Sequence, residues 1–100
     1  MKRQEFLDVV KAVGVGNRIK ITYKDNAIPT LPYLIGMYNA GLFTLEDPGL
    51  SLLYAIVRSQ KWDREQNKTF LLVITESFDL EWFVDRLHWD VESVEVIIEN

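Results

Sequence analysis

Apolar residues recur at three- and four-residue intervals in four stretches of the chain, as they do along the buried face of a helix. This spacing predicts amphipathic helices over residues 6–13, 31–38, 50–57 and 80–87. The apolar positions that define the four stripes are Phe6, Val9, Val10 and Val13; Leu31, Leu34, Ile35 and Tyr38; Leu50, Leu53, Tyr54 and Val57; and Leu80, Phe83, Val84 and Leu87.

Polar residues and a glycine mark the ends of these helices. Thr30, Asp47 and either Ser77 or Asp79 stand where an N-cap side chain can accept a hydrogen bond from the first backbone N–H groups. Gly41 follows the second stripe, at a place where a left-handed backbone commonly ends a helix. The caps therefore support the helix boundaries that the apolar spacing predicts.

Four other segments have the pattern of strands. Residues 18–24 alternate charged with bulky side chains, which is the period of a strand with one covered face. Residues 69–75 hold a continuous apolar run, which predicts a central strand buried on both faces. In residues 94–99, Val94, Val96 and Ile98 alternate with Glu95, Ile97 and Glu99, which suits an edge strand protected by charge. Residues 42–45 are a short fourth candidate.

Helices and strands alternate along the chain. This order predicts an α/β fold with a small, open, mostly parallel sheet of three or four strands and helices on both faces. Residues 1–100 form a single domain in this interpretation, because neither a repeat nor a linker interrupts them. The alternative is an α+β fold, in which residues 42–45 are a loop and the last strand runs antiparallel.

The composition is that of a folded domain. Hydrophobic residues make up 48% of the chain, which is enough apolar surface to exclude intrinsic disorder. The longest apolar runs fall far short of the ~20 residues that cross a bilayer. The absence of cysteine excludes a disulfide framework and thiolate metal sites. With no apolar stretch behind the first residues, we expect no secretory signal, no membrane partner and a cytoplasmic location.

Charge is divided between the two ends of the chain, which has a net charge of −4. Residues 1–24 contain six bases and two acids, for a net charge of +4, whereas residues 76–100 contain one base and eight acids, for −7. Such a division can orient a charged partner. Alternatively, the two ends lie side by side and neutralise each other.

Acidic residues follow three of the predicted strands. They are Asp25, the pair Glu46 and Asp47, and Glu76. The carboxyl ends of parallel strands meet at one edge of a sheet, so these carboxylates would converge there. Oxygen atoms are the ligands that Mg²⁺ requires, and the cluster would suit a Mg²⁺-dependent protein or enzyme that binds a nucleotide or another phosphate compound. Ordinary caps and turns are the competing explanation.

A basic segment that contains a tryptophan, residues 58–68, has the composition of a surface for single-stranded nucleic acid. Two acids reduce its net charge to +2, and the chain as a whole is acidic, whereas nucleic-acid domains are usually basic. Nucleic acid is therefore a partner that we do not favour, and a continuation of the third helix is the alternative. The candidate contacts are Arg58, Lys61, Trp62, Arg64 and Lys68.

Trp82, Asp85, Arg86 and Trp89 share the side of the last helix that lies away from its apolar stripe. Exposed tryptophan is enriched in the centres of protein interfaces. We therefore predict an interface at these residues, either with a protein partner or with a second copy of the chain. The neighbouring His88 is the one histidine of the chain and suits packing or a helix end better than catalysis, so no residue is assigned a catalytic role.

These observations favour a non-catalytic protein-interaction or regulatory domain that forms a homodimer or belongs to an assembly. The first alternative is a Mg²⁺-dependent protein or enzyme that binds a phosphate compound or nucleotide. The second alternative is a nucleic-acid accessory protein. We expect no cofactor, apart from Mg²⁺ under the first alternative.

Overall fold

The computed structural model describes residues 1–24, 31–45, 58 and 69–98. Strands stand at all four predicted segments, and the bounds of three of them differ from the prediction by one residue. The elements are α1 (Arg3–Val10), β1 (Arg18–Tyr23), α2 (Leu31–Asn39), β2 (Phe43–Leu45), β3 (Thr69–Ile74), α4 (Leu80–Leu87) and β4 (Val91–Ile97). The predicted helix over residues 50–57 lies outside the described residues.

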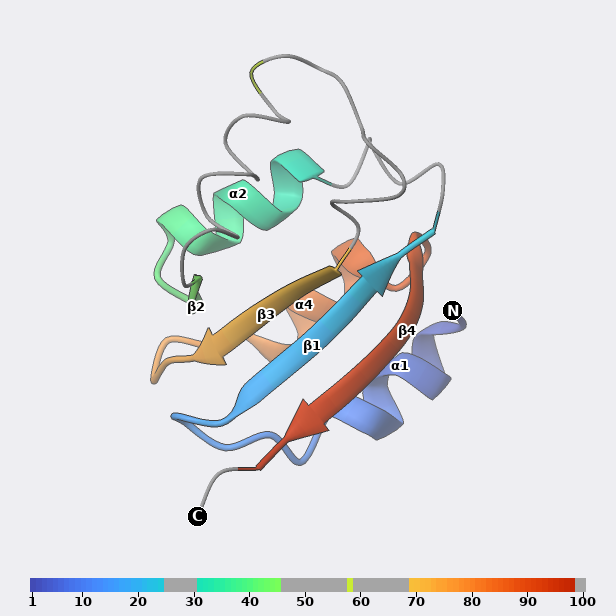
Figure 1. The fold of residues 1–100 in the computed structure, drawn as a ribbon, viewed down its shortest axis with the longest axis horizontal. Helices are drawn as coiled ribbons and strands as arrows, with labels where there is room; N and C mark the ends of the chain where they lie inside the picture. Colours follow the sequence, from blue (N-terminus) through green and yellow to red (C-terminus); the bar gives the residue numbers. More distant parts are fainter. Residues whose placement is uncertain (25–30, 46–57, 59–68, 99–100) are drawn as a thin grey trace.

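The four strands form one open sheet in the order β2-β3-β1-β4, and every neighbouring pair is antiparallel (Figure 1). Ile19 of β1 stands opposite Leu72 of β3 on one side and Val96 of β4 on the other. The prediction of a mostly parallel α/β sheet is therefore wrong. An α+β fold with an antiparallel last strand, the alternative, agrees with the structure, although residues 43–45 form a strand and not a loop.

The order of elements along the chain could not reveal the direction of the strands. β1 and β2 point the same way, as do β3 and β4, but another strand lies between the members of each pair. A helix that connects such strands gives the same alternation as one that connects adjacent parallel strands. The described elements from β1 to β4 have the order and strand directions of the split β-α-β topology, also called ferredoxin-like, and α1 precedes them.

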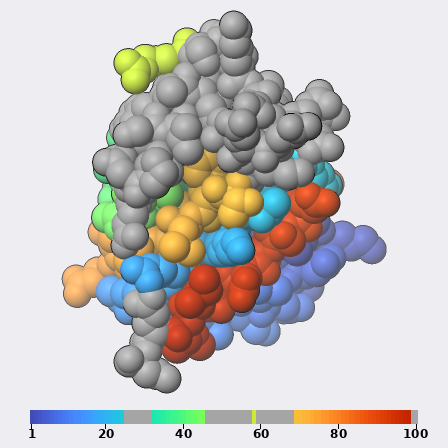
Figure 2. Space-filling view, viewed as in Figure 1, coloured from blue at the N-terminus to red at the C-terminus, as the bar shows by residue number. Residues whose placement is uncertain are grey.

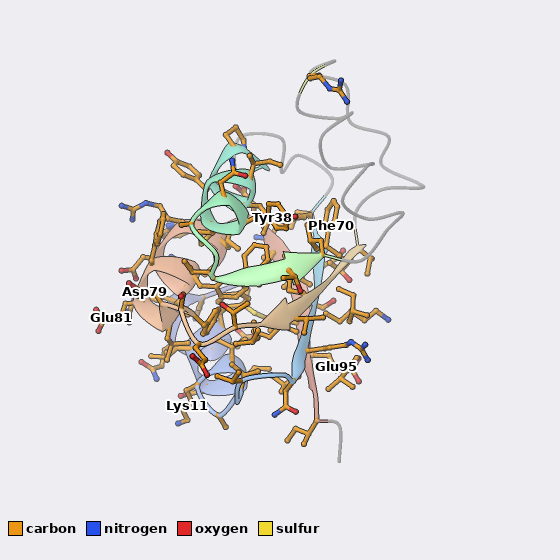
Figure 3. All side chains as sticks on the ribbon, turned by 90° about the vertical axis from the view of Figure 1, so that its left-hand side faces the viewer. Lys11, Tyr38, Phe70, Asp79, Glu81 and Glu95 are labelled. Carbon is orange, nitrogen blue, oxygen red and sulfur yellow. The ribbon has the colours of Figure 1, made fainter. Side chains whose placement is uncertain are left out.

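All three described helices cover the same face of the sheet (Figures 1 and 3), so the predicted helical cover of both faces is not found among the described residues. The inner strand β3 consequently has one buried face instead of two. Phe70, Leu72 and Ile74 are buried under the helices, whereas Leu71 and Val73 on the opposite face are only half-buried. The continuous apolar run correctly predicted an inner strand. Its prediction that both faces of the strand are buried is wrong.

The face of the sheet without a described helix is mixed in character. Figure 2 shows the atoms of β3, β1 and β4 side by side on it. Lys20 stands opposite Glu95 on the neighbouring strand, and Glu95 projects away from the helices in Figure 3. The hydroxyl groups of Thr22 and Thr69 lie 3.2 Å apart. Cross-strand pairs of this kind stabilise a sheet that has one face toward solvent.

Gly41 ends α2 as the sequence predicts. Its φ of 84° is in the left-handed region, which glycine adopts without steric cost. The N–H of Gly41 donates to the carbonyl of Tyr38 (3.0 Å), and the N–H of Leu42 donates to the carbonyl of Met37 (3.1 Å). These two bonds form a Schellman motif, and the buried side chains of Met37 and Leu42 supply its apolar contact.

The N-cap of α4 is Asp79 and not Ser77, so one of the two predicted candidates is confirmed. A carboxylate oxygen of Asp79 accepts a hydrogen bond from the N–H of Trp82 at 3.1 Å. Thr30 and Asp47, the other predicted caps, lie outside the described residues.

The first helix begins three residues before its predicted start, at Arg3, because its first turn is polar and carries no part of the apolar stripe.

Aromatic rings join the first helix to the last one in the core. The ring of Phe83 on α4 lies 5.6 Å from that of Phe6 on α1, 6.4 Å from Phe43 on β2 and 5.2 Å from Phe78. Phe6, Phe43 and Phe83 are almost fully buried. The N-terminal helix is therefore part of the single core and is held against the C-terminal third of the chain.

The one-sided core predicts unequal effects of two neighbouring leucines on β3. Leu72→Ala opens a cavity beneath the helices and should lower the free energy of unfolding by about 2–5 kcal/mol. Leu71→Ala, the matched control on the opposite face, should lower it by about 1 kcal/mol or less. Urea denaturation followed by circular dichroism measures both, and equal losses would contradict one-sided burial.

Candidate binding surface around Trp89

Trp89 is the most exposed large hydrophobic residue of the described chain, with 70% of its surface accessible. It lies in the short connection between α4 and β4, and hydrogen bonds fix the backbone on both sides of it. Lys24 Nζ donates to the carbonyl of Trp89 (3.0 Å), and the backbone N–H of Lys24 donates to the carbonyl of Asp90 (2.8 Å). The N–H of Asp90 donates to the carbonyl of Leu87 (3.2 Å). The exposed side chain therefore stands on a fixed backbone.

The imidazole ring of His88 packs against the indole ring of Trp89. It is only 4% exposed, and its Nδ1 lies 3.0 Å from the carbonyl oxygen of Met1. A carbonyl can only accept, so Nδ1 carries the proton and donates it. The imidazole ring is 4.4 Å from the indole ring of Trp89, at an interplanar angle of 39°. The histidine is thus a packing and capping residue, as the sequence indicated, and it limits the positions that the indole can take.

Met1, the first residue of the chain, contacts the beginning of β4. Its ammonium group donates to the carbonyl of Val91 at 3.0 Å, which ties the beginning of α1 to the beginning of β4. Partial burial lowers the pKa of this ammonium group, and the nearby ammonium group of Lys24 lowers that pKa further. Two cationic groups therefore lie close together beside Trp89.

A hollow of about 330 Å³ lies between these residues. Its lining is formed by five side chains, which we call the Trp89 surface: Met1, Lys2, Glu5, Lys24 and Trp89. The indole, Met1 and the alkyl stems of the two lysines offer apolar contact, while the ammonium groups of Lys2 and Lys24 outnumber the one carboxylate. This combination can hold a small anionic group together with an apolar one.

The other residues of the predicted interface have different surroundings. Trp82 is half-buried and packs against the core, so it does not share the exposure of Trp89. Arg86 is exposed in the last turn of α4. Asp85 is exposed and accepts a hydrogen bond from Arg3 Nε at 2.6 Å, which lowers the pKa of the Asp85 carboxyl group. Of the two tryptophans of the predicted interface, Trp89 is therefore the exposed one.

The sequence analysis missed Lys2, Glu5 and Lys24 as neighbours of Trp89. They are 65 or more positions away along the chain, and no local pattern connects them to it. The sequence feature that pointed to this proximity was the opposite net charge of the two ends of the chain. The interpretation that the ends lie side by side is confirmed by the ion pair of Arg3 with Asp85 and by the pairing of β1 with β4.

The antiparallel topology separates the carboxyl ends of the strands that were predicted to form a magnesium site at one edge of the sheet. β3 runs antiparallel to β1 and points opposite to β2, so Glu76, which is exposed just beyond β3, lies at the other end of the sheet from the carboxyl ends of β1 and β2. Asp25, Glu46 and Asp47 lie outside the described residues. Among the residues that the structure describes, no three acidic or histidine side chains are grouped to hold a metal ion.

The predicted nucleic-acid segment is represented in the structure by one residue. Arg58 is exposed. Lys61, Trp62, Arg64 and Lys68 lie outside the described residues, so the prediction stays a prediction.

Comparisons of the chain with protein-family models, with curated proteins and with solved structures find no match. None of the helices that the structure describes is long and apolar enough to cross a membrane. The function must therefore be inferred from the geometry of the chain's own residues.

The ion pair of Arg3 and Asp85 predicts a pH-dependent contribution to stability. The pKa of Asp85 is lowered in the folded protein, so the pair stabilises the fold above the ordinary aspartate pKa of 3.8. That contribution is lost as the pH falls through the lower pKa of the folded state. Asp85→Asn should therefore lower the melting temperature slightly at pH 7 and leave it unchanged at the acid end of the titration.

Thermal melts of the wild type and of Asp85→Asn between pH 7 and about pH 2 check this expectation. Glu76→Gln, which removes an exposed carboxylate at the far end of the sheet, is the control for the change in net charge. A deficit of Asp85→Asn that persists undiminished in acid would show that the ion pair is not its cause.

Proposed function

We propose that this chain is a non-catalytic protein-interaction domain that contacts its partner through the Trp89 surface. The observation that carries the proposal is the exposure of Trp89 on a backbone held by hydrogen bonds. A large indole left in water has an energetic cost for an isolated domain, and a partner that covers it removes that cost. Tryptophan is among the residues that contribute most to protein interfaces.

The rigidity of the site supports the same proposal. Association loses the conformational freedom of every side chain that the interface immobilises. The indole of Trp89 has already lost part of that freedom, because His88 packs against it and is itself held by Met1. A contact with a preorganised aromatic ring therefore retains more of its gross binding energy than a contact with a freely rotating side chain.

The partner is a second copy of the chain or another protein of the same assembly. We place the domain in the cytoplasm, because its sequence has no cysteine with which to build the disulfides common in small secreted domains. Trp82, Asp85 and Arg86 belong to the proposed interface as its flank along α4. Since Trp82 packs against the core, we assign it a smaller share of the binding energy than Trp89.

The proposal predicts that Trp89→Ala weakens binding without loss of the fold. Peptides selected from a random displayed library on the wild-type domain should bind Trp89→Ala about 30-fold more weakly, the loss that corresponds to an interface residue worth about 2 kcal/mol. Fluorescence anisotropy of labelled peptides measures the affinities. The melting temperature of Trp89→Ala should remain close to that of the wild type, because the indole is mostly in solvent.

Trp82→Phe is the matched control, because it changes the other tryptophan of the predicted interface and keeps an apolar ring against the core. It should leave peptide affinity within about threefold of the wild type. A selection that yields no binding peptide, or peptides that bind Trp89→Ala as well as the wild type, would contradict the proposed function. If the selected peptides do depend on Trp89, sedimentation of the wild type at high concentration distinguishes a second copy of the chain from a different protein as the partner.

A further inference from the structure

We infer that the Trp89 surface recognises an acidic segment of its protein partner, in which a carboxylate lies next to an apolar side chain. The inference rests on the proposed function and names the chemistry of the partner. It depends on a juxtaposition that the fold creates: Lys2, Lys24 and Trp89 line one hollow although they come from α1's beginning, the end of β1 and the α4–β4 connection.

The first argument is the balance of charge in the hollow. Lys2 and Lys24 line it together with a single acid, Glu5, so its lining is positive on a chain whose net charge is −4. Lys24 is held in place by its bond to the carbonyl of Trp89, which uses one of the three N–H donors of an ammonium group. A carboxylate that enters the hollow meets a positioned donor and needs little rearrangement.

The second argument is the crowding of cations. Partial burial and the nearby ammonium group of Lys24 both lower the pKa of the Met1 ammonium group, and both residues line the hollow. An anion between the two ammonium groups would replace this repulsion with attraction. The hollow is therefore a better site for an anion than for a neutral polar group.

The third argument is the apolar wall. The exposed indole of Trp89 and the side chain of Met1 form part of the lining, and the alkyl stems of the lysines extend it. A free inorganic anion would leave this wall in water. A peptide with an aromatic or branched aliphatic residue beside its carboxylate covers the wall and the cations together. The volume of about 330 Å³ accommodates one or two such side chains.

The surroundings favour a short acidic segment over a nucleic acid. Glu5 lies within the site, and Asp90 is near enough to act on the Met1 ammonium group. A polyphosphate chain that extended beyond the hollow would approach these carboxylates and be repelled. A peptide presents its carboxylates at one or two positions and its neutral backbone elsewhere, so it can occupy the hollow without that repulsion.

The test uses three probes and four variants of the full chain. The first probe is an eight-residue peptide that alternates glutamate with leucine and phenylalanine, the second is the same peptide with glutamine in place of glutamate, and the third is an eight-nucleotide oligothymidine. The variants are Lys2→Gln, Lys24→Gln, Trp89→Ala and the control Lys11→Gln. Lys11 carries the same charge but follows the far end of α1, where it pairs with Asp8 at 3.3 Å.

We expect the acidic peptide to bind the wild type at least about tenfold more tightly than the glutamine peptide, and its affinity to fall as salt rises from about 50 mM to about 300 mM. Lys2→Gln and Lys24→Gln should each weaken it about threefold or more, as expected for a partly exposed charge pair. Trp89→Ala should weaken both peptides. Lys11→Gln should leave all affinities unchanged.

Each contrary outcome points to a different failure. If library-selected peptides need Trp89 but the acidic and glutamine peptides bind equally or not at all, the acidic partner is refuted and the proposed function stands. If the oligothymidine binds more tightly than the acidic peptide, the surface is one for nucleic acid and the inference is overturned. If no peptide of any kind depends on Trp89, both the inference and the proposed function are wrong.

Discussion

β1 forms antiparallel ladders along both of its edges, with β3 on one side and β4 on the other. A strand from the first quarter of the chain is thereby fixed between two strands from its last third. The residues that precede β1 in the chain are thereby brought close to the same strands. The helix α1 packs against α4 and β4, with Phe6 beside Phe83. The hydrophobic core and the neutralisation of the oppositely charged ends both result from this one insertion of β1 into the middle of the sheet.

The same pairing builds the Trp89 surface. At the end of β1, the N–H of Lys24 bonds to the carbonyl of Asp90, and this fixes where the lysine side chain can reach. At the beginning of β4, the carbonyl of Val91 accepts a hydrogen bond from Met1. Two of the residues that line the hollow beside the indole, Met1 and Lys24, are thus positioned by backbone hydrogen bonds at the margin of the sheet.

The elements could be predicted from the sequence to the extent that their signals are local. The stripe of α4, its cap Asp79 and the glycine that ends α2 are properties of a few neighbouring residues, and the structure confirms them. Strand direction is not such a property, so the alternation of helices and strands gave the wrong sheet. The apolar run around Leu72 could not reveal how many faces of β3 are buried, because that number depends on where the helices lie. Trp89 could be singled out by its type, whereas its neighbour Lys24 becomes visible only once β1 is paired with β4.

Trp89 is an exposed but fixed indole between the first residues of the chain and the end of β1. Nuclear Overhauser effects of the Trp89 indole protons in the uniformly labelled protein test it most directly. The account predicts cross-peaks from the indole to the side chains of Met1 and Lys24, which line the same hollow. An indole whose cross-peaks are confined to its sequence neighbours would contradict the claim, because the corner that holds the proposed partner would then not exist.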